Sequence, residues 1–202
     1  IRHRRSSKLI VENSNFVFPD DIQDGDALVA FSRRKVLMLA TLLKKKGYTV
    51  SVIYGSLPYS VRKAEMARFL SGESRIVVCT DAIGMGVNLP IRRVIFTEVE
   101  KFDGLIKRRL NMGEIKQIAG RAGRKGLYDQ GYVNAFEGRE YIAALVAGKY
   151  KQITSCVIQP PRKVLDMPYS LSEIFRIWLK TIDRTCFSVA DLKNRIKLAE
   201  YI

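Results

Sequence analysis

The 202-residue sequence is poor in histidine and cysteine, and both scarcities exclude kinds of catalysis. Its one histidine, His3, lies near the N-terminus, which argues against Ser-His-Asp, Cys-His and HExxH chemistry. Cys79, Cys156 and Cys186 are far apart and form no CxxC pair. We therefore expect neither a zinc ribbon nor a redox dithiol, and we predict no metal-binding residues.

Long apolar runs are also missing. No stretch approaches the ~20 apolar residues that cross a bilayer, so we expect no membrane-spanning segment. Residues 1–10 lack the apolar core of a signal peptide. The sequence opens at Ile1 and not at Met, and we expect it to be a fragment of a longer protein.

Two nucleotide-binding motifs are absent as well. The sequence has no GxxxxGK[ST] phosphate loop, and no DExD or DExH cluster follows a strand-like run. In the common NTPases these motifs cradle the triphosphate and hold Mg²⁺. We therefore do not expect the chain by itself to bind and hydrolyse ATP in that way.

Positive charge is what the sequence has in excess. It holds 35 Lys and Arg against 20 Asp and Glu, a formal net charge of +15. On charge alone, a surplus of this size favours a polyanionic partner, with nucleic acid first and an anionic membrane surface second. Of these two we predict nucleic acid and no membrane.

Short apolar runs alternate with helical patterns along most of the chain. The strand-like runs are residues 27–31, 49–54, 75–80, 93–97 and 131–136. The helical patterns are residues 33–46, 58–70, 115–122 and 140–147. Strands separated by helices need crossover connections, which predicts an α/β fold with a largely parallel sheet and helices on both faces.

The pattern changes near residue 150. Pro160 and Pro161 interrupt it, and beyond them Ser170 and Glu173 have the spacing of a helix capping box. We therefore divide the chain into an N-terminal extension or linker (1–24), an α/β domain (25–150) and the start of a helical domain (151–202).

The segment QIAGRAGR combines one amide with two arginines. On a helix Gln117, Arg121 and Arg124 would share one face, and the apolar side chains would pack on the sheet. The planar guanidinium group can bridge phosphate oxygens. Gly120 and Gly123 leave room for another surface to approach. An RNA-binding RG-type loop or a solvated basic helix is the alternative interpretation.

A second segment, CTDAIGMGVNLP, begins where a strand-like run ends. Ligands of open parallel sheets bind at the carboxyl ends of the strands. There the Thr80 hydroxyl and backbone amides suit a phosphate, and the Asp81 carboxylate suits a ribose or a polar switch. The alternative is that Thr80 and Asp81 cap the following turn.

Serines follow two other predicted strands. Ser32 in FSRRK and Ser56 in YGSLP each precede a predicted helix, whose N-terminus attracts phosphate. Ordinary helix capping would explain either serine alone. Together with Thr80 they would form one phosphate-binding edge of the sheet.

In this order and spacing the segments resemble the second RecA-like domain of superfamily 2 helicases. FSRRK resembles motif IV, CTDAIGMGVNLP motif V and QIAGRAGR motif VI. The segments YGSLP, TDAIGMGVNLPIRRVIF and QIAGRAGR are similar to the corresponding sequences of the mitochondrial degradosome RNA helicase family and its bacterial relatives. The resemblance covers residues 25–140, continues more weakly into the helical tail, and implies a RecA-like fold.

The resemblance also implies roles at an ATP cleft. Arg121 and Arg124 would reach the γ-phosphate as arginine fingers, and Gln117 would face the nucleotide or its attacking water. These three are the implied catalytic residues, and they bind ATP together with Asp81, Gly84 and Gly86.

A second implied set holds the nucleic-acid backbone. Such contacts carry no sequence information, which suits a motor that travels over any sequence. The residues of this set are Ser32, Arg33, Gly55, Ser56 and Thr80.

Taken together, the resemblance implies the C-terminal half of the motor of an ATP-dependent RNA helicase. Its partners would be single-stranded RNA, with DNA as a further track, and the first RecA-like domain of the same protein. That domain would make most contacts to ATP and Mg²⁺, so we expect this fragment alone to be inactive and to hold no cofactor. An exoribonuclease is a further implied partner. A bacterial cytoplasm is favoured over a mitochondrial matrix.

Two alternatives stay open. One is a stand-alone basic nucleic-acid-binding module without ATPase activity, and the other is a DNA-directed superfamily 2 helicase. One departure from the family lies in residues 98–111 (EVEKFDGLIKRRLN), which are shorter than the family's segment. We interpret them as a hairpin or loop that is solvated and does not separate strands.

Overall fold

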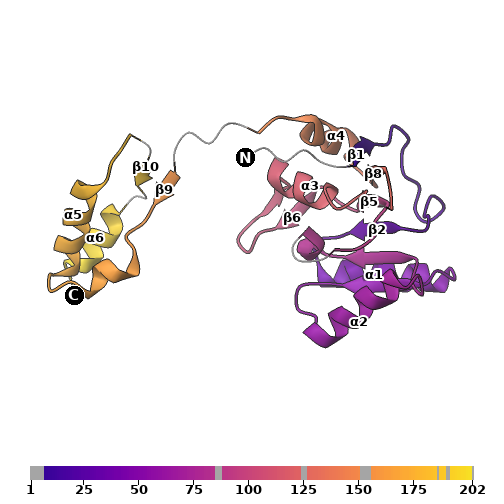
Figure 1. Ribbon diagram of the computed structural model, residues 1–202, viewed down its shortest axis with the longest axis horizontal. Helices are drawn as coiled ribbons and strands as arrows, with labels where there is room; N and C mark the ends of the chain where they lie inside the picture. Colours follow the sequence, from indigo (N-terminus) through magenta and orange to yellow (C-terminus); the bar gives the residue numbers. More distant parts are fainter. Residues whose placement is uncertain are drawn as a thin grey trace. The chain divides into compact units, whose positions relative to one another are not determined.

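The computed structural model describes residues 7–84, 88–123, 127–150, 156–185, 187–189 and 192–201. The chain forms two compact units, Ile1–Lys149 and Tyr150–Ile202, called the first and second unit below (Figure 1).

The first unit alternates strands with helices. Its strands are β1 (Lys8–Val11), β2 (Asp26–Val29), β3 (Val50–Ile53), β4 (Ile76–Cys79), β5 (Arg93–Phe96), β6 (Glu100–Phe102), β7 (Lys107–Arg109) and β8 (Gln130–Ala135). Its helices are α1 (Arg33–Lys45), α2 (Tyr59–Leu70), the 3₁₀ turn η1 (Asp81–Gly84), α3 (Met112–Ala119) and α4 (Arg139–Ala147).

Six of these strands form one sheet in the order β1-β8-β5-β2-β4-β3. Every neighbouring pair is parallel, and in the centre Leu28 lies opposite Val78 and Ile95. The strands β2, β4 and β5 are buried along their whole length, as expected for parallel strands that are covered on both faces. The predicted α/β fold with a parallel sheet is confirmed.

Helices cover both faces of this sheet. On one face Val36, Leu39 and Leu43 of α1 pack on side chains such as Leu28. On the other face the buried side chains of α3 and α4, among them Ile115, pack on the alternate strand residues. The period of two along β2 thus supplies both cores.

The N-terminal segment differs from the expected linker. Residues 8–11 form the edge strand β1, which pairs in parallel with β8 from Lys8↔Gln130 to Val11↔Val133. Glu12 continues the attachment, because its carboxylate accepts hydrogen bonds from Arg93 and Asn134. The sheet therefore begins well before residue 25.

The segment 98–111 contains an antiparallel hairpin. In it β6 and β7 pair with Lys101 opposite Arg108. Its tip is open to solvent, with Leu105 88% and Ile106 62% exposed. Its base is held by ion pairs that are described below, so only the tip fits the expected solvated loop.

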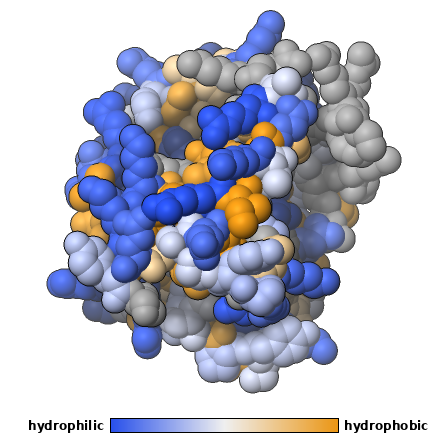
Figure 2. Space-filling model, turned by 90° about the vertical axis from the view of Figure 1, so that its left-hand side faces the viewer, coloured by the Kyte–Doolittle hydropathy of each residue, from blue (hydrophilic) through white to orange (hydrophobic). Residues whose placement is uncertain are grey.

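The second unit is small. It consists of β9 (Cys156–Ile158), the 3₁₀ helix η2 (Arg162–Asp166), α5 (Leu171–Thr181), β10 (Phe187–Val189) and α6 (Lys193–Ala199). The predicted capping box is present, since Glu173 N donates to Ser170 Oγ and Ser170 N donates to Glu173. Figure 2 shows one face that is largely hydrophilic, with hydrophobic residues exposed between the hydrophilic ones. Among the described residues, no helix is long and apolar enough to cross a membrane.

Candidate functional site

The parallel sheet brings the predicted backbone-binding hydroxyls to one edge. Ser32, Ser56 and Thr80 follow the carboxyl ends of β2, β3 and β4, and these strands are neighbours in the order β2-β4-β3. Because parallel strands end at the same edge, the three hydroxyl residues lie at adjacent strand ends.

Two of these hydroxyls also cap local structure. Ser32 Oγ accepts a hydrogen bond from Lys35 N at 3.2 Å and caps α1. Thr80 Oγ1 accepts one from Ala82 N at 3.4 Å at the start of η1. Both residues therefore make the local capping hydrogen bonds that the alternative interpretation expected. It leaves each O–H proton to be donated, and a phosphate oxygen is a suitable acceptor.

The other two members of the set lie beside Tyr54. The Arg33 guanidinium is stacked over the Tyr54 ring, 5.2 Å from its centroid. Gly55 is exposed, and a Cβ atom there would meet nothing within 4 Å. Its carbonyl accepts a hydrogen bond from Arg62 at 2.7 Å, which fixes the loop before α2.

The predicted ATP-side residues converge on one carbonyl group. Gly84, the last residue of η1, is buried, and its carbonyl oxygen accepts a hydrogen bond from Gln117 Nε2 at 3.2 Å. Arg121 Nη2 donates to the same oxygen. A Cβ atom on Gly84 would lie 3.4 Å from Gln117 Cγ, so η1 and α3 are in close contact.

The QIAGRAGR segment is not helical throughout. The helix α3 ends at Ala119, and Arg121 follows it in a turn. The helix ends here because of two glycines. Gly120 caps it, and Gly123 has φ +74° and donates its N–H to the carbonyl oxygen of Ile91. The expectation that Gln117 and Arg121 share a helical face is therefore wrong, although both reach the same carbonyl group.

Two predicted site residues, Gly86 and Arg124, lie outside the described residues. Of the predicted ATP-binding residues, the structure therefore describes Asp81, Gly84, Gln117 and Arg121.

Ion pairs that the sequence did not reveal lie beside this group. Lys101 Nζ is 3.0 Å from Asp81 Oδ2 and 2.9 Å from Glu114 Oε1. Arg108 Nη2 is also 2.9 Å from Glu114 Oε1. The hydrogen bond from Arg108, with those from Asn111 N and Lys101, lowers the pKa of Glu114 to about 2 despite partial burial. Nothing in the sequence joins these residues, because only the fold brings them together.

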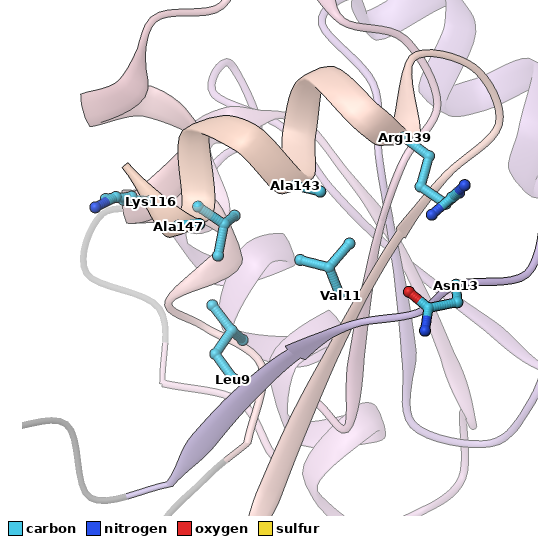
Figure 3. A pocket seen from close by; sticks show the side chains of 8 residues that line it. Leu9, Val11, Asn13, Lys116, Arg139, Ala143 and Ala147 are labelled. Carbon is cyan, nitrogen blue, oxygen red and sulfur yellow. The ribbon is translucent and has the colours of Figure 1, made fainter. Parts of the chain in front are cut away.

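A separate cavity of about 600 Å³ lies between β1 and α4 (Figure 3). Leu9 and Val11 of the strand line it together with Ala143 and Ala147 of the helix. None of the described predicted site residues lines this cavity, so the candidate site is at the strand ends. Within the described part of the chain, no cluster of His, Cys, Asp or Glu could hold a metal ion.

Three features define the class of protein: the parallel sheet, the η1 turn in the motif V segment, and the turn after α3 that carries Arg121. Together they define the second RecA-like domain of a superfamily 2 helicase. The chain belongs to the helicase conserved C-terminal domain family, whose family model matches residues 9–126. Its relatives place it with the DExH helicases of the degradosome type.

Three relatives illustrate the similarity. The chain is 32% identical over 217 residues to "ATP-dependent RNA helicase SUV3, mitochondrial" of Candida albicans, which covers 100% of this chain and 30% of the relative. The Saccharomyces cerevisiae protein of that name is 33% identical, covering 88% of this chain and 27% of the relative. The Oryza sativa subsp. japonica protein is 44% identical, covering 61% and 22%.

The expectation that favoured a bacterial cytoplasm is wrong, because these relatives are named as mitochondrial proteins. The chain spans less than a third of the length of these curated relatives.

Proposed function

We propose that this chain is the C-terminal half of the motor of an ATP-dependent RNA helicase. The observation that carries the proposal is the convergence of Gln117 and Arg121 on the Gly84 carbonyl oxygen, at one end of the motif V turn. The names of the relatives support ATP as the fuel and RNA as the track.

The donor set at Gly84 suits a triphosphate. Arg121 offers a planar fork of N–H donors, and Gln117 adds an uncharged amide beside it. When bound between this domain and the first RecA-like domain, ATP supplies the phosphoanhydride whose hydrolysis drives the motor. Arg121, with Arg124, stabilises the charge that develops on the γ-phosphate, and such a finger is worth ~10³–10⁵ in rate. Mg²⁺ belongs to the first domain in this account.

The strand-end hydroxyls suit an RNA backbone. Ser32, Ser56 and Thr80 follow adjacent strands, and Gly55 and Arg33 lie next to them. Because Arg121 and the strand-end hydroxyls belong to the same compact unit, closure on the first domain would move both together. Closure would thereby couple hydrolysis to a shift of the RNA backbone.

Two further parts of the proposal concern the whole protein. The chain alone is inactive, because the phosphate loop and the DExH box are supplied by the first domain. The compartment is the mitochondrial matrix, which the names of the relatives support. An exoribonuclease partner stays a prediction.

The test is nucleotide hydrolysis by the full-length protein with and without single-stranded RNA, and with DNA of the same sequence. The proposal expects turnover that RNA stimulates and no turnover by residues 1–202 alone. RNA binding without any turnover would favour the stand-alone binding module. Equal or greater stimulation by DNA would favour the DNA-directed helicase.

A further inference from the structure

A lysine of the β6–β7 hairpin joins the two elements that meet at Gly84. Lys101 Nζ contacts Asp81 Oδ2 at 3.0 Å and Glu114 Oε1 at 2.9 Å. Asp81 is the first residue of η1, whose last residue is Gly84. Glu114 lies in the first turn of α3, one turn before Gln117. One ammonium group therefore bridges the two elements that also meet at the Gly84 carbonyl group.

This lysine is held more firmly than an ordinary surface lysine. Its side chain is only 18% exposed, so its ion pairs are partly shielded from water. Burial lowers the pKa of Lys101, but hydrogen bonds to Glu114 and Asp81 outweigh it and the net pKa is raised. The group thus stays charged at neutral pH.

Arg108 adds further contacts between the hairpin and α3. It lies opposite Lys101 in the hairpin and donates from Nη1 and Nη2 to both oxygens of Glu114 at 3.0 and 2.9 Å. Its Nε donates to Asp103 in the hairpin loop at 2.9 Å. The hairpin, η1 and α3 are therefore tied together by charged groups from three separate stretches of sequence.

We propose that Lys101 is a positioning residue for the ATP site, which holds η1 against α3 so that Gln117 and Arg121 stay aligned on Gly84. It touches neither nucleotide nor reacting atoms in this account. The proposal rests on the proposed function, since it assigns Lys101 a part in the same hydrolysis. A small shift of a catalytic group is enough to slow a reaction by about 100-fold.

The hairpin itself offers a matched control. Lys107 is in the paired strand and forms an ion pair with Glu100 at 2.8 Å, but its side chain is 72% exposed. This ion pair lies within the hairpin and involves neither η1 nor α3. Lys107→Met therefore removes the same charge and the same kind of contact, and it leaves the contacts of Lys101 with Asp81 and Glu114 in place.

The experiment compares Lys101→Met, Lys101→Arg and Lys107→Met in the full-length protein by RNA-stimulated ATPase kinetics. We expect Lys101→Met to lower kcat about 10- to 100-fold while KM for ATP changes less than about threefold. Lys101→Arg should recover most of the loss, because it restores the charge. Lys107→Met should stay within about twofold of wild type.

Three results would overturn the proposal. One is a Lys101→Met enzyme as active as Lys107→Met. A second is a loss of kcat that matches a loss of folded protein in thermal melts. A third is a loss that Lys101→Arg does not recover. Arg121→Ala, measured alongside, separates the two claims: if it too keeps full turnover, the proposed function itself fails.

Discussion

Gly131 of β8 lies so close to Ala122 that a Cβ atom on Gly131 would stand 2.5 Å from the carbonyl carbon and the carbonyl oxygen of Ala122. A Cβ atom on Gly123 would likewise stand 2.7 Å from the Gly131 nitrogen. The turn that carries Arg121 therefore packs closely against β8 of the parallel sheet. The approaching surface that the sequence predicted for Gly123 is the protein's own strand β8.

Gly131→Ala should lower the free energy of unfolding by about 2–3 kcal/mol, because its Cβ atom meets backbone that cannot turn aside. The measurement is urea unfolding of the chain followed by circular dichroism. The control is Gly55→Ala, where a Cβ atom would meet nothing within 4 Å and the change should stay within about 0.5 kcal/mol. Equal effects of the two substitutions would contradict the packing described here.

Arg93 forms a buried ion pair that should tolerate joint but not single replacement. Its Nε and Nη2 lie 2.9 and 2.7 Å from the carboxylate of Asp26, and Arg93 is only 6% exposed. Arg93→Leu leaves that carboxylate without its partner and should cost about 3–5 kcal/mol. Adding Asp26→Leu should recover part of this loss in a double-mutant cycle. A double variant that is less stable than the sum of the single changes would argue against the pair.

Ser32→Asp separates helix capping from RNA binding. Aspartate caps a helix about as well as serine, so the free energy of unfolding should stay within about 0.5 kcal/mol, whereas Ser32→Ala should lose about 1 kcal/mol. The added negative charge should weaken binding of single-stranded RNA to the full-length protein about tenfold at low salt. Ser71→Asp, which adds the same charge at the C-cap of α2, is the control. If both aspartates change RNA affinity equally, Ser32 does not face the RNA.

The Glu114 carboxylate should contribute a pH-dependent part of the stability. Its pKa is lowered from 4.5 to about 2, chiefly by the hydrogen bond from Arg108 and against the effect of burial. A lowered pKa means that the contribution is complete above pH 4.5 and is lost as the pH falls toward 2. Since the group is partly exposed, we expect only about 1 kcal/mol.

The comparison that isolates this contribution is wild type against Glu114→Gln in urea unfolding at pH 7 and at pH 3. The two free energies of unfolding should differ at pH 7 and approach each other at pH 3. A difference that is the same at both values would show that the Glu114 charge plays no part.

The alternation of apolar runs and helical patterns was enough to predict the parallel sheet. The central strand β4 is apolar at every position, and β2 and β5 are apolar apart from their first residues, Asp26 and Arg93. The edge strand β1 was missed because Lys8–Val11 has no helix before β2, and its partner β8 lies about 120 residues away. Long-range pairing of that kind leaves no local signal.

The candidate site was predicted in part. Its motifs indicated Gln117, Arg121 and the strand-end hydroxyls, since the residue types needed for phosphate contacts are local in sequence. The end of α3 before Arg121 was missed, because the packing of Gly123 on Gly131 outweighs the helical spacing. The contacts of Lys101 were missed because they depend on where three separate segments meet.

In the proposed function Arg121 acts on ATP. The most direct measurement is RNA-stimulated ATP hydrolysis by the full-length protein, with wild type, Arg121→Ala and Arg75→Ala compared at saturating RNA. Arg75 is a suitable control, because it is exposed and pairs with Asp24 at 2.8 Å, at the opposite edge of the sheet. We predict that Arg121→Ala lowers kcat by about 10³-fold while RNA affinity stays within about threefold, and that Arg75→Ala changes neither. An Arg121→Ala enzyme that keeps the turnover of wild type would contradict the account.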